Sequence, residues 1–142
     1  MVDLYNKRVL IAASSANLLR SLNICLQMNG CKTIMANSAV QAMSLAIRED
    51  PDLIILDIGL PHGDAYRLMK HLRSVVTSSS IPIVIMREQL HSIRLESDHN
   101  TRISGYIRNP ADIEELLETV QAIFQNNESQ KCTQTVRQEF AA

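Results

Sequence analysis

The sequence predicts an α/β domain built on a five-stranded, doubly wound parallel sheet. Five short runs are continuously apolar, without the polar alternation that a strand with one exposed face shows. Segments with helical spacing of apolar residues separate these runs, which implies parallel strands joined by right-handed crossovers, with helices on both faces. The predicted strands are residues 9–13, 32–36, 53–57, 83–86 and 105–107.

The first helix is predicted to follow the first strand directly. Ser15 has the side chain and the position of a helix N-cap. Asn29 and Gly30 predict a left-handed ending about four turns later. The helical spacing predicts that one face packs into the core, with Leu18, Leu19, Leu22, Cys25 and Leu26.

The second helix is predicted between Ser38 and Pro51. Ser38 and Gln41 have the spacing of a capping box, in which each side chain satisfies a backbone N–H at the helix start. Pro51 cannot continue a helix, so the helix ends before it. The residues predicted to point inward are Val40, Met43, Ala46 and Ile47.

Two further helices have clear apolar faces. The third begins near Asp64, and the last begins with Asp112 as N-cap and Glu115 as its capping-box partner. The third is expected to bury Ala65, Leu68, Met69, Leu72, Val75 and Val76, and the last Ile113, Leu116, Leu117, Val120 and Phe124.

Two segments lack such a face. Residues 87–104 contain few apolar anchors, so a fourth helix there is expected to be short or loosely packed. Residues 126–142 are polar, and only Val136 and Phe140 are spaced to form a short helical face. We therefore expect a domain over residues 1–125, followed by a polar tail or a short docking helix over 126–142.

The composition is that of an ordinary globular domain. Of 142 residues, 46% are hydrophobic and 20% are charged, and the formal net charge is −1. No run approaches the ~18 apolar residues of a membrane span, and no secretory leader is recognisable, so we expect a cytoplasmic protein without membrane contact. The cationic residues are dispersed, which argues against nucleic-acid binding.

The three cysteines, Cys25, Cys31 and Cys132, have no metal-ligand spacing. Their odd number suits a reducing compartment and argues against a disulfide framework. Cys25 and Cys31 are expected to act as small buried hydrophobic residues.

Asp57 is the leading candidate for a functional residue, because it ends a buried strand. In doubly wound sheets, binding sites form beyond the carboxyl ends of the strands. A carboxylate there can also serve only to cap the turn that follows. The residue type and position leave both roles open.

The residues around Asp57 resemble the central motif of response-regulator receiver domains. In PDLIILDIGLPHGDAYRL (51–68), Asp57 stands at the phosphoacceptor position, Pro61 follows it, and Asp64 with Ala65 occupies the Asp-Gly position. IPIVIM (81–86) and GYIRNP (105–110) resemble the fourth and fifth strands of this family, with Pro110 at its proline position. The resemblance covers residues 7 to about 125 and implies a flavodoxin-like (βα)5 fold with strand order 2-1-3-4-5.

The resemblance also implies a set of supporting residues that this sequence does not match. Receivers hold Mg²⁺ with an acidic pair after the first strand, where this chain has Ala13 and Ser14. Arg87 stands at the Ser/Thr position after the fourth strand, and Asn109 at the lysine position after the fifth. In the family these residues hold Mg²⁺ and neutralise the charge of the transferred phosphoryl group. Because they are missing here, we expect no resident metal or other cofactor.

Two of the matched positions keep two interpretations each. Arg87 could pair with Asp57 and occlude the phosphoryl position, or it could point into solvent. Tyr106, at the family's aromatic switch position, could anchor a partner or simply pack at a strand end.

Three functions remain in view. The favoured one is a pseudo-receiver that acts through protein–protein contacts without Mg²⁺-dependent phosphorylation and is not an enzyme. Its partner would be another signalling protein, such as a histidine kinase or an output protein, and no oligomeric state is predicted. The alternatives are a single-domain response regulator phosphorylated on Asp57 by a histidine kinase, with weak Mg²⁺ binding, and a sensor of a small ligand at the strand ends.

Overall fold

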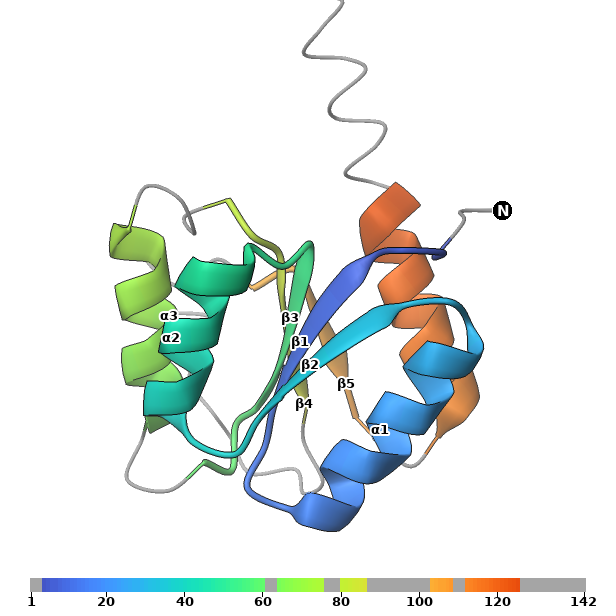
Figure 1. The fold of residues 1–142 in the computed structure, drawn as a ribbon, viewed down its shortest axis with the longest axis horizontal. Helices are drawn as coiled ribbons and strands as arrows, with labels where there is room; N and C mark the ends of the chain where they lie inside the picture. The colour runs from blue at the N-terminus through green and yellow to red at the C-terminus, as the bar shows by residue number, and fades with distance from the viewer. Residues whose placement is uncertain (1–3, 61–63, 76–79, 87–102, 109–111, 126–142) are drawn as a thin grey trace, which may run out of the picture.

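A computed structural model describes residues 4–60, 64–75, 80–86, 103–108 and 112–125. Five parallel strands form one sheet in the order β2-β1-β3-β4-β5, which confirms the predicted fold class and strand order (Figure 1). The strands are β1 (Arg8–Ala12), β2 (Lys32–Ala36), β3 (Leu53–Asp57), β4 (Ile83–Met86) and β5 (Gly105–Ile107), and the helices are α1 (Ala16–Met28), α2 (Ala39–Glu49), α3 (Asp64–Ser74) and one over residues 113–125. The predictions for 87–102 and 126–142 lie outside the described residues.

The sheet lies between two helical layers. Helices α2 and α3 cover one face, and α1 and the helix of residues 113–125 cover the other (Figure 1). Strand β3 packs against both helical layers, because successive side chains of a strand point to opposite faces of the sheet. Leu53 and Ile55 belong to the core cluster with α1, while Ile54 and Leu56 belong to the cluster with α2 and α3. All four are fully buried, which explains the continuously apolar sequence of this strand.

The predicted helix ends follow local side-chain chemistry. The Ser15 hydroxyl accepts a hydrogen bond from the Leu18 N–H at 3.2 Å, which confirms the N-cap of α1. Gly30, with φ of 89°, follows the other end of α1. The N–H of Cys31 there donates to the Leu26 carbonyl at 3.0 Å. A side chain at position 30 would lie 2.9 Å from a ring carbon of Tyr5, so the position suits glycine for two reasons.

The two predicted capping boxes form only in part. Ser38 accepts from the Gln41 N–H at 3.2 Å, but the Gln41 side chain accepts from Asn37, one residue before the cap. Likewise, Asp112 accepts from the Glu115 N–H at 3.3 Å, and the Glu115 carboxylate accepts from Arg108. In both cases the second side chain reaches further back along the chain than the reciprocal motif requires.

Three residues predicted to point inward are instead exposed. Val40 and Ile47 of α2 are 83% and 50% exposed, because α2 faces the sheet with Ala42 and Ala46. Ile113 is 58% exposed at the start of its helix, and the core contacts come from the later turns. Helix α3 ends at Ser74, so the predicted inward residue Val75 lies just beyond it and is half-buried, and Val76 lies outside the described residues. The remaining predicted core residues of these helices are buried or half-buried.

Strand β2 also departs from the prediction of full burial. It forms one edge of the sheet, and Lys32 and Met35 are exposed. Its apolar sequence resembles that of the central strands, so sequence alone did not distinguish an edge from the middle of the sheet. At the other edge, Tyr106 of β5 is 44% exposed.

Cys25 and Cys31 are buried free thiols, as predicted, whereas Cys132 lies outside the described residues. Burial raises the pKa of the Cys25 thiol. Burial, reinforced by the charge of Cys25, raises the pKa of Cys31 to about 11. Both thiols therefore stay protonated at neutral pH and act as packing groups.

The amino ends of the strands are joined by polar contacts from Arg8. Its guanidinium lies 2.6 Å from the Glu49 carboxylate at the end of α2. Its backbone N–H donates to the Asp52 carboxylate at 2.9 Å, and its carbonyl accepts from the Asp52 N–H at 2.8 Å. These bonds connect β1, α2 and the start of β3 at the end of the sheet opposite Asp57. In the described part of the chain, no helix is long and apolar enough to cross a bilayer.

Candidate functional site

The carboxyl ends of the parallel strands meet along one edge of the sheet, at the bottom of Figure 1. Asp57 is the last residue of β3 and lies in register with Met86, the last residue of β4. On its other side, Leu56 pairs with Ala12, so Ala13 follows β1 beside the Asp57 position. The fold therefore places Asp57 between two strand ends, where doubly wound proteins bind ligands.

The Asp57 carboxylate takes part in the turn that follows β3. Its Oδ1 accepts a hydrogen bond from the Gly59 N–H at 2.9 Å, which is the geometry of an Asx turn. The Asp57 side chain is half-buried, and the Leu60 N–H donates to its backbone carbonyl at 3.3 Å. The turn-capping role left open by the sequence is thus present, and it does not use all the acceptor positions of an ionised carboxylate.

Gly59 is a residue of this site that the sequence analysis missed. A side chain at position 59 would lie 3.2 Å from the Asp57 Oδ1, so glycine lets the turn approach the carboxylate closely. The Asp-x-Gly spacing after an apolar strand is a known turn signal and could have revealed it.

The residues beside Asp57 on β1 do not fit the magnesium site of the resembled family. Ala13 is fully buried within the core, and its N–H donates to the Ala36 carbonyl at 3.1 Å. Its methyl group cannot ligate a cation, and the neighbouring Ser14 is an exposed neutral hydroxyl. Magnesium is usually held by one or two carboxylates at short, nearly octahedral distances. Among the residues that the structure describes, no group of three or more His, Cys, Asp or Glu side chains is placed to hold a metal ion.

The other site positions are divided between described and undescribed parts of the chain. Tyr106 pairs in register with Ile85 and keeps its ring partly in solvent. Arg87 and Asn109 lie outside the described residues, so both interpretations of Arg87, a pair with Asp57 or a side chain in solvent, stay open.

Comparison with known proteins gives the family of this fold and site. Residues 9–121 match the response regulator receiver domain family. This chain belongs to that family. Its receiver fold is close to that of a CheY-like receiver domain protein from Methanospirillum hungatei, with a TM-score of 0.79 and 20% identity over 88% of this chain and 98% of that one.

Two curated relatives place the receiver domain among proteins of different length. It is 25% identical to the response regulator MprA of Mycobacterium leprae over 94% of this chain and 58% of MprA, so it spans less than two thirds of that relative. It is also 25% identical to the protein PilH of Pseudomonas aeruginosa, over 82% of this chain and 96% of PilH. Receiver domains are signalling modules that interact with other signalling proteins.

The turn hydrogen bond leads to a test of what the Asp57 side chain does for stability. Asp57→Ala is expected to lower the free energy of unfolding by about 1 kcal/mol, because the Gly59 N–H loses its acceptor. Asp57→Asn keeps an oxygen at the same place and is expected to stay within about 0.5 kcal/mol of the natural chain. Urea unfolding of the three proteins measures both differences, and equal losses in the two variants would contradict the capping role.

Proposed function

We propose that this receiver domain signals through protein–protein contacts and does not depend on Mg²⁺-assisted phosphorylation of Asp57. The observation that supports the proposal most directly is the buried methyl group of Ala13, which occupies an acidic-pair position next to Asp57. A phosphoryl donor brings several negative charges, and its transition state needs cations around the transferred group. With Ala13 and Ser14 in place of the acidic pair, the side chains after β1 supply no charged ligand for Mg²⁺.

The two substitutions outside the described residues support the same function. Arg87 at the Ser/Thr position would place a permanent cation near Asp57, and a guanidinium–carboxylate pair would fill the space that a phosphoryl group needs. Asn109 removes the charge of the family's lysine. In this proposal the domain has no catalytic residues, needs no metal, and acts by binding a histidine kinase, an output protein or another signalling partner.

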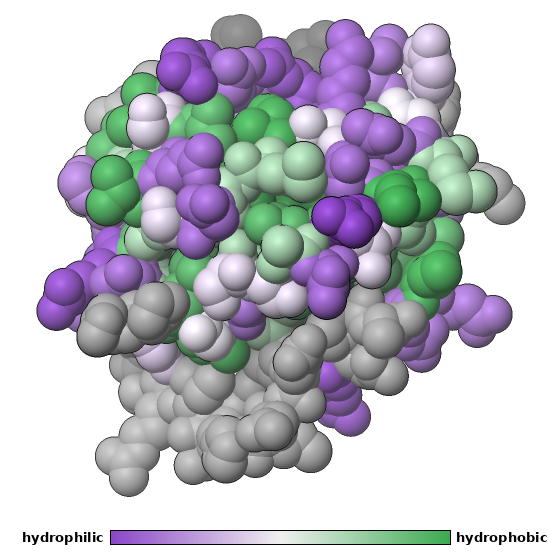
Figure 2. All heavy atoms as spheres, turned by 60° about the horizontal axis from the view of Figure 1, so that its bottom comes forward, coloured by the Kyte–Doolittle hydropathy of each residue, from purple (hydrophilic) through white to green (hydrophobic). Residues whose placement is uncertain are grey.

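The surface at the carboxyl ends of the strands is compatible with such contacts. Figure 2 turns this end toward the viewer, and among the described residues of the face in view hydrophobic side chains reach the surface between hydrophilic ones. Protein interfaces commonly combine apolar and polar groups in this way. Tyr106, with 44% of its surface exposed on the edge strand β5, offers an aromatic group of the kind enriched in interfaces.

A second candidate function is supported by Asp57 itself. The carboxylate stands at the family's phosphoacceptor position and keeps acceptor capacity beyond its bond to Gly59. A histidine kinase could supply part of the missing charge stabilisation in a complex, so slow phosphorylation of Asp57 is the alternative to test.

Incubation with acetyl phosphate and Mg²⁺, followed by intact-mass measurement, separates the two functions. The proposal predicts no stoichiometric phosphoryl adduct, because the receiver domain lacks the acidic pair that would bind Mg²⁺. A mass increase of ~80 Da that is absent from the Asp57→Asn variant would contradict it and support phosphotransfer. The same measurement on a chain with Ala13→Asp and Ser14→Asp, which restores the acidic pair, provides a matched comparison.

A further inference from the structure

Helices α2 and α3 border a groove on the surface of the receiver domain. The groove has a volume of about 500 Å³ and is lined by Ala39, Val40, Met43, Ser44 and Ile47 of α2 and by Asp64, Arg67, Leu68 and His71 of α3. Its lining extends over about two turns of each helix, roughly 10 Å, so the groove is elongated along the helices. This shape fits a helix laid along it better than a compact small molecule.

The floor of the groove is apolar and is not covered by another described element. Val40 and Ile47 are 83% and 50% exposed, and Met43 between them is half-buried. Their spacing of three and four residues places them along one side of α2, away from Ala42 and Ala46, which face the sheet. Helix α2 thus has a second apolar face, which the sequence analysis assigned to the core. Exposed apolar faces of this kind mark contact surfaces more often than isolated exposed residues do.

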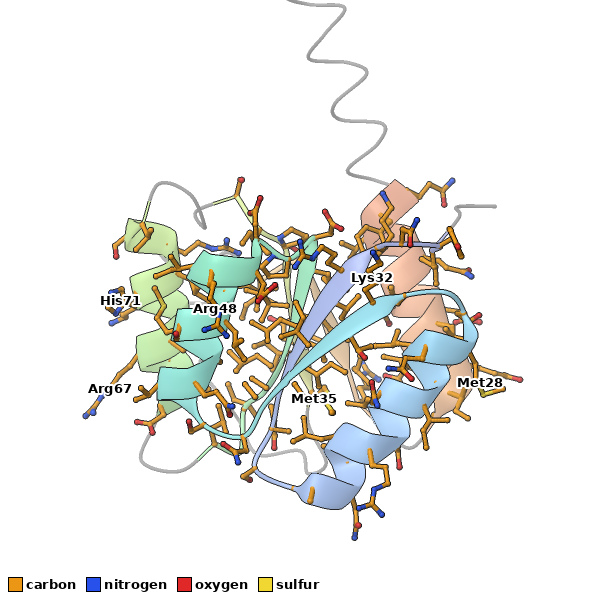
Figure 3. The ribbon with its side chains drawn as sticks, viewed as in Figure 1. Met28, Lys32, Met35, Arg48, Arg67 and His71 are labelled. Carbon is orange, nitrogen blue, oxygen red and sulfur yellow. The ribbon has the colours of Figure 1, made fainter. Side chains whose placement is uncertain are left out.

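The charged side chains at the groove are two arginines and one lining carboxylate. Arg67 and His71 line it from α3 and project outward from that side of the molecule, and Arg48 follows Ile47 on α2 (Figure 3). Asp64 is the acidic residue in the lining. Glu49, the acidic residue of α2, lies 2.6 Å from Arg8 and 3.4 Å from Arg48, so two guanidinium groups share one carboxylate. A partner with carboxylates beside its apolar residues would therefore be favoured over a basic one.

We propose that the α2–α3 groove binds an acidic amphipathic helix of a partner protein. Apolar residues of the partner, spaced by three and four positions, would pack on Val40, Met43 and Ile47, while its carboxylates would approach Arg67 and His71. The inference rests on the proposed function, in which the chain acts through protein contacts, and it adds the surface and the chemistry of the partner. The site lies beside α2 and α3, so it does not require Asp57 to be modified.

The test uses the full chain labelled with ¹⁵N and a designed peptide probe. The probe is an amphipathic helix of about 15 residues with leucine at positions i, i+3, i+4 and i+7 and glutamate at the flanking positions. Amide shift changes are expected along α2 and α3, around Val40, Ile47 and Arg67. A matched peptide with lysine in place of glutamate is expected to bind roughly tenfold more weakly.

Variants with matched controls locate the site. Ile47→Glu is expected to weaken the binding of the glutamate peptide by roughly tenfold or more, since it places a charge on the groove floor. Ile24→Glu on α1 is the control, because Ile24 is 51% exposed against 50% for Ile47. Arg67→Glu provides an independent variant that leaves the apolar floor intact, and it is expected to reduce the preference for the acidic peptide.

Several results would overturn the proposal. Shift changes confined to other elements, equal binding of the lysine peptide, or equal weakening by Ile24→Glu would each do so. Shifts of α2 and α3 that depend on the concentration of the free chain would assign the groove to a second copy, and contacts from residues 126–142 in the free chain would assign it to its own tail. A phosphoryl adduct on Asp57 would contradict the proposed function. Because that adduct is measured without peptide, failure of the proposed function can be distinguished from failure of peptide binding at the groove.

Discussion

A chain that carries both Ala13→Asp and Ser14→Asp is expected to bind Mg²⁺ beside Asp57, while the natural chain is not. The register of β1 and β3 places position 13 next to Asp57, so the two new carboxylates would complete an acidic set at the strand ends. A ligand present at one hundred times its dissociation constant stabilises the folded state by about 2.7 kcal/mol. Excess Mg²⁺ is therefore expected to raise the melting temperature of the variant by several degrees.

The same variant is expected to be less stable than the natural chain without Mg²⁺. Ala13 is fully buried, and a carboxylate there must be desolvated next to another negative charge. The control is Gln27→Asp with Met28→Asp, at exposed neighbouring positions of α1. It adds the same charge far from the carboxyl ends of the strands. If Mg²⁺ stabilised the natural chain as much as the double variant, the explanation based on the missing acidic pair would be wrong.

Ile55→Ala is expected to cause the largest loss of stability, about 2–5 kcal/mol. Ile55 is fully buried in the central strand β3 and packs in the cluster shared with α1 and the helix of residues 113–125. Removing its side chain leaves a cavity that strands on both sides hold open. Against a total stability of roughly 5–15 kcal/mol, a loss of this size would be visible as a large shift of the urea midpoint.

Ile24→Ala supplies the comparison of the same substitution at a surface position. Ile24 is 51% exposed on α1, so this change is expected to stay within about 0.5 kcal/mol of the natural chain. Similar losses for Ile24→Ala and Ile55→Ala would mean that the buried cluster does not dominate the stability of this sheet.

The parts of the fold that sequence predicted correctly depend on local signals. Ser15 and Ser38 mark helix starts because their hydroxyls accept bonds from N–H groups three residues ahead. The continuously apolar run that ends in Asp57 predicts a central strand, because a strand buried on both faces has no exposed polar positions. These features need no knowledge of distant residues.

The parts that were predicted wrongly depend on contacts between distant elements. Val40 and Ile47 have the spacing of a core-facing stripe, but the small side chains of Ala42 and Ala46 set which face of α2 meets the sheet. The apolar composition of β2 likewise gave no sign that this strand forms an edge.

For the candidate site, sequence predicted the strand-end position of Asp57 and, as one of two roles, the capping of the next turn, but not that Gly59 donates the bond. The strand-end position of Asp57 and the burial of Ala13 follow from the same apolar runs that define β1 and β3. The hydrogen bond from Gly59 depends on the conformation of the turn, which the strand pattern leaves undetermined. The α2–α3 groove was missed because it requires the relative orientation of two helices.

The bonds made by Arg8 suggest how such a domain can change its chemistry during evolution and still fold. Arg8, Glu49 and Asp52 fasten three elements at the amino ends of the strands. Asp57, Ala13 and the turn at Gly59 lie at the opposite, carboxyl ends of the strands. Substitutions at the carboxyl ends therefore leave the bonds of Arg8 in place, so the candidate site can change its residues while the scaffold keeps its anchoring contacts.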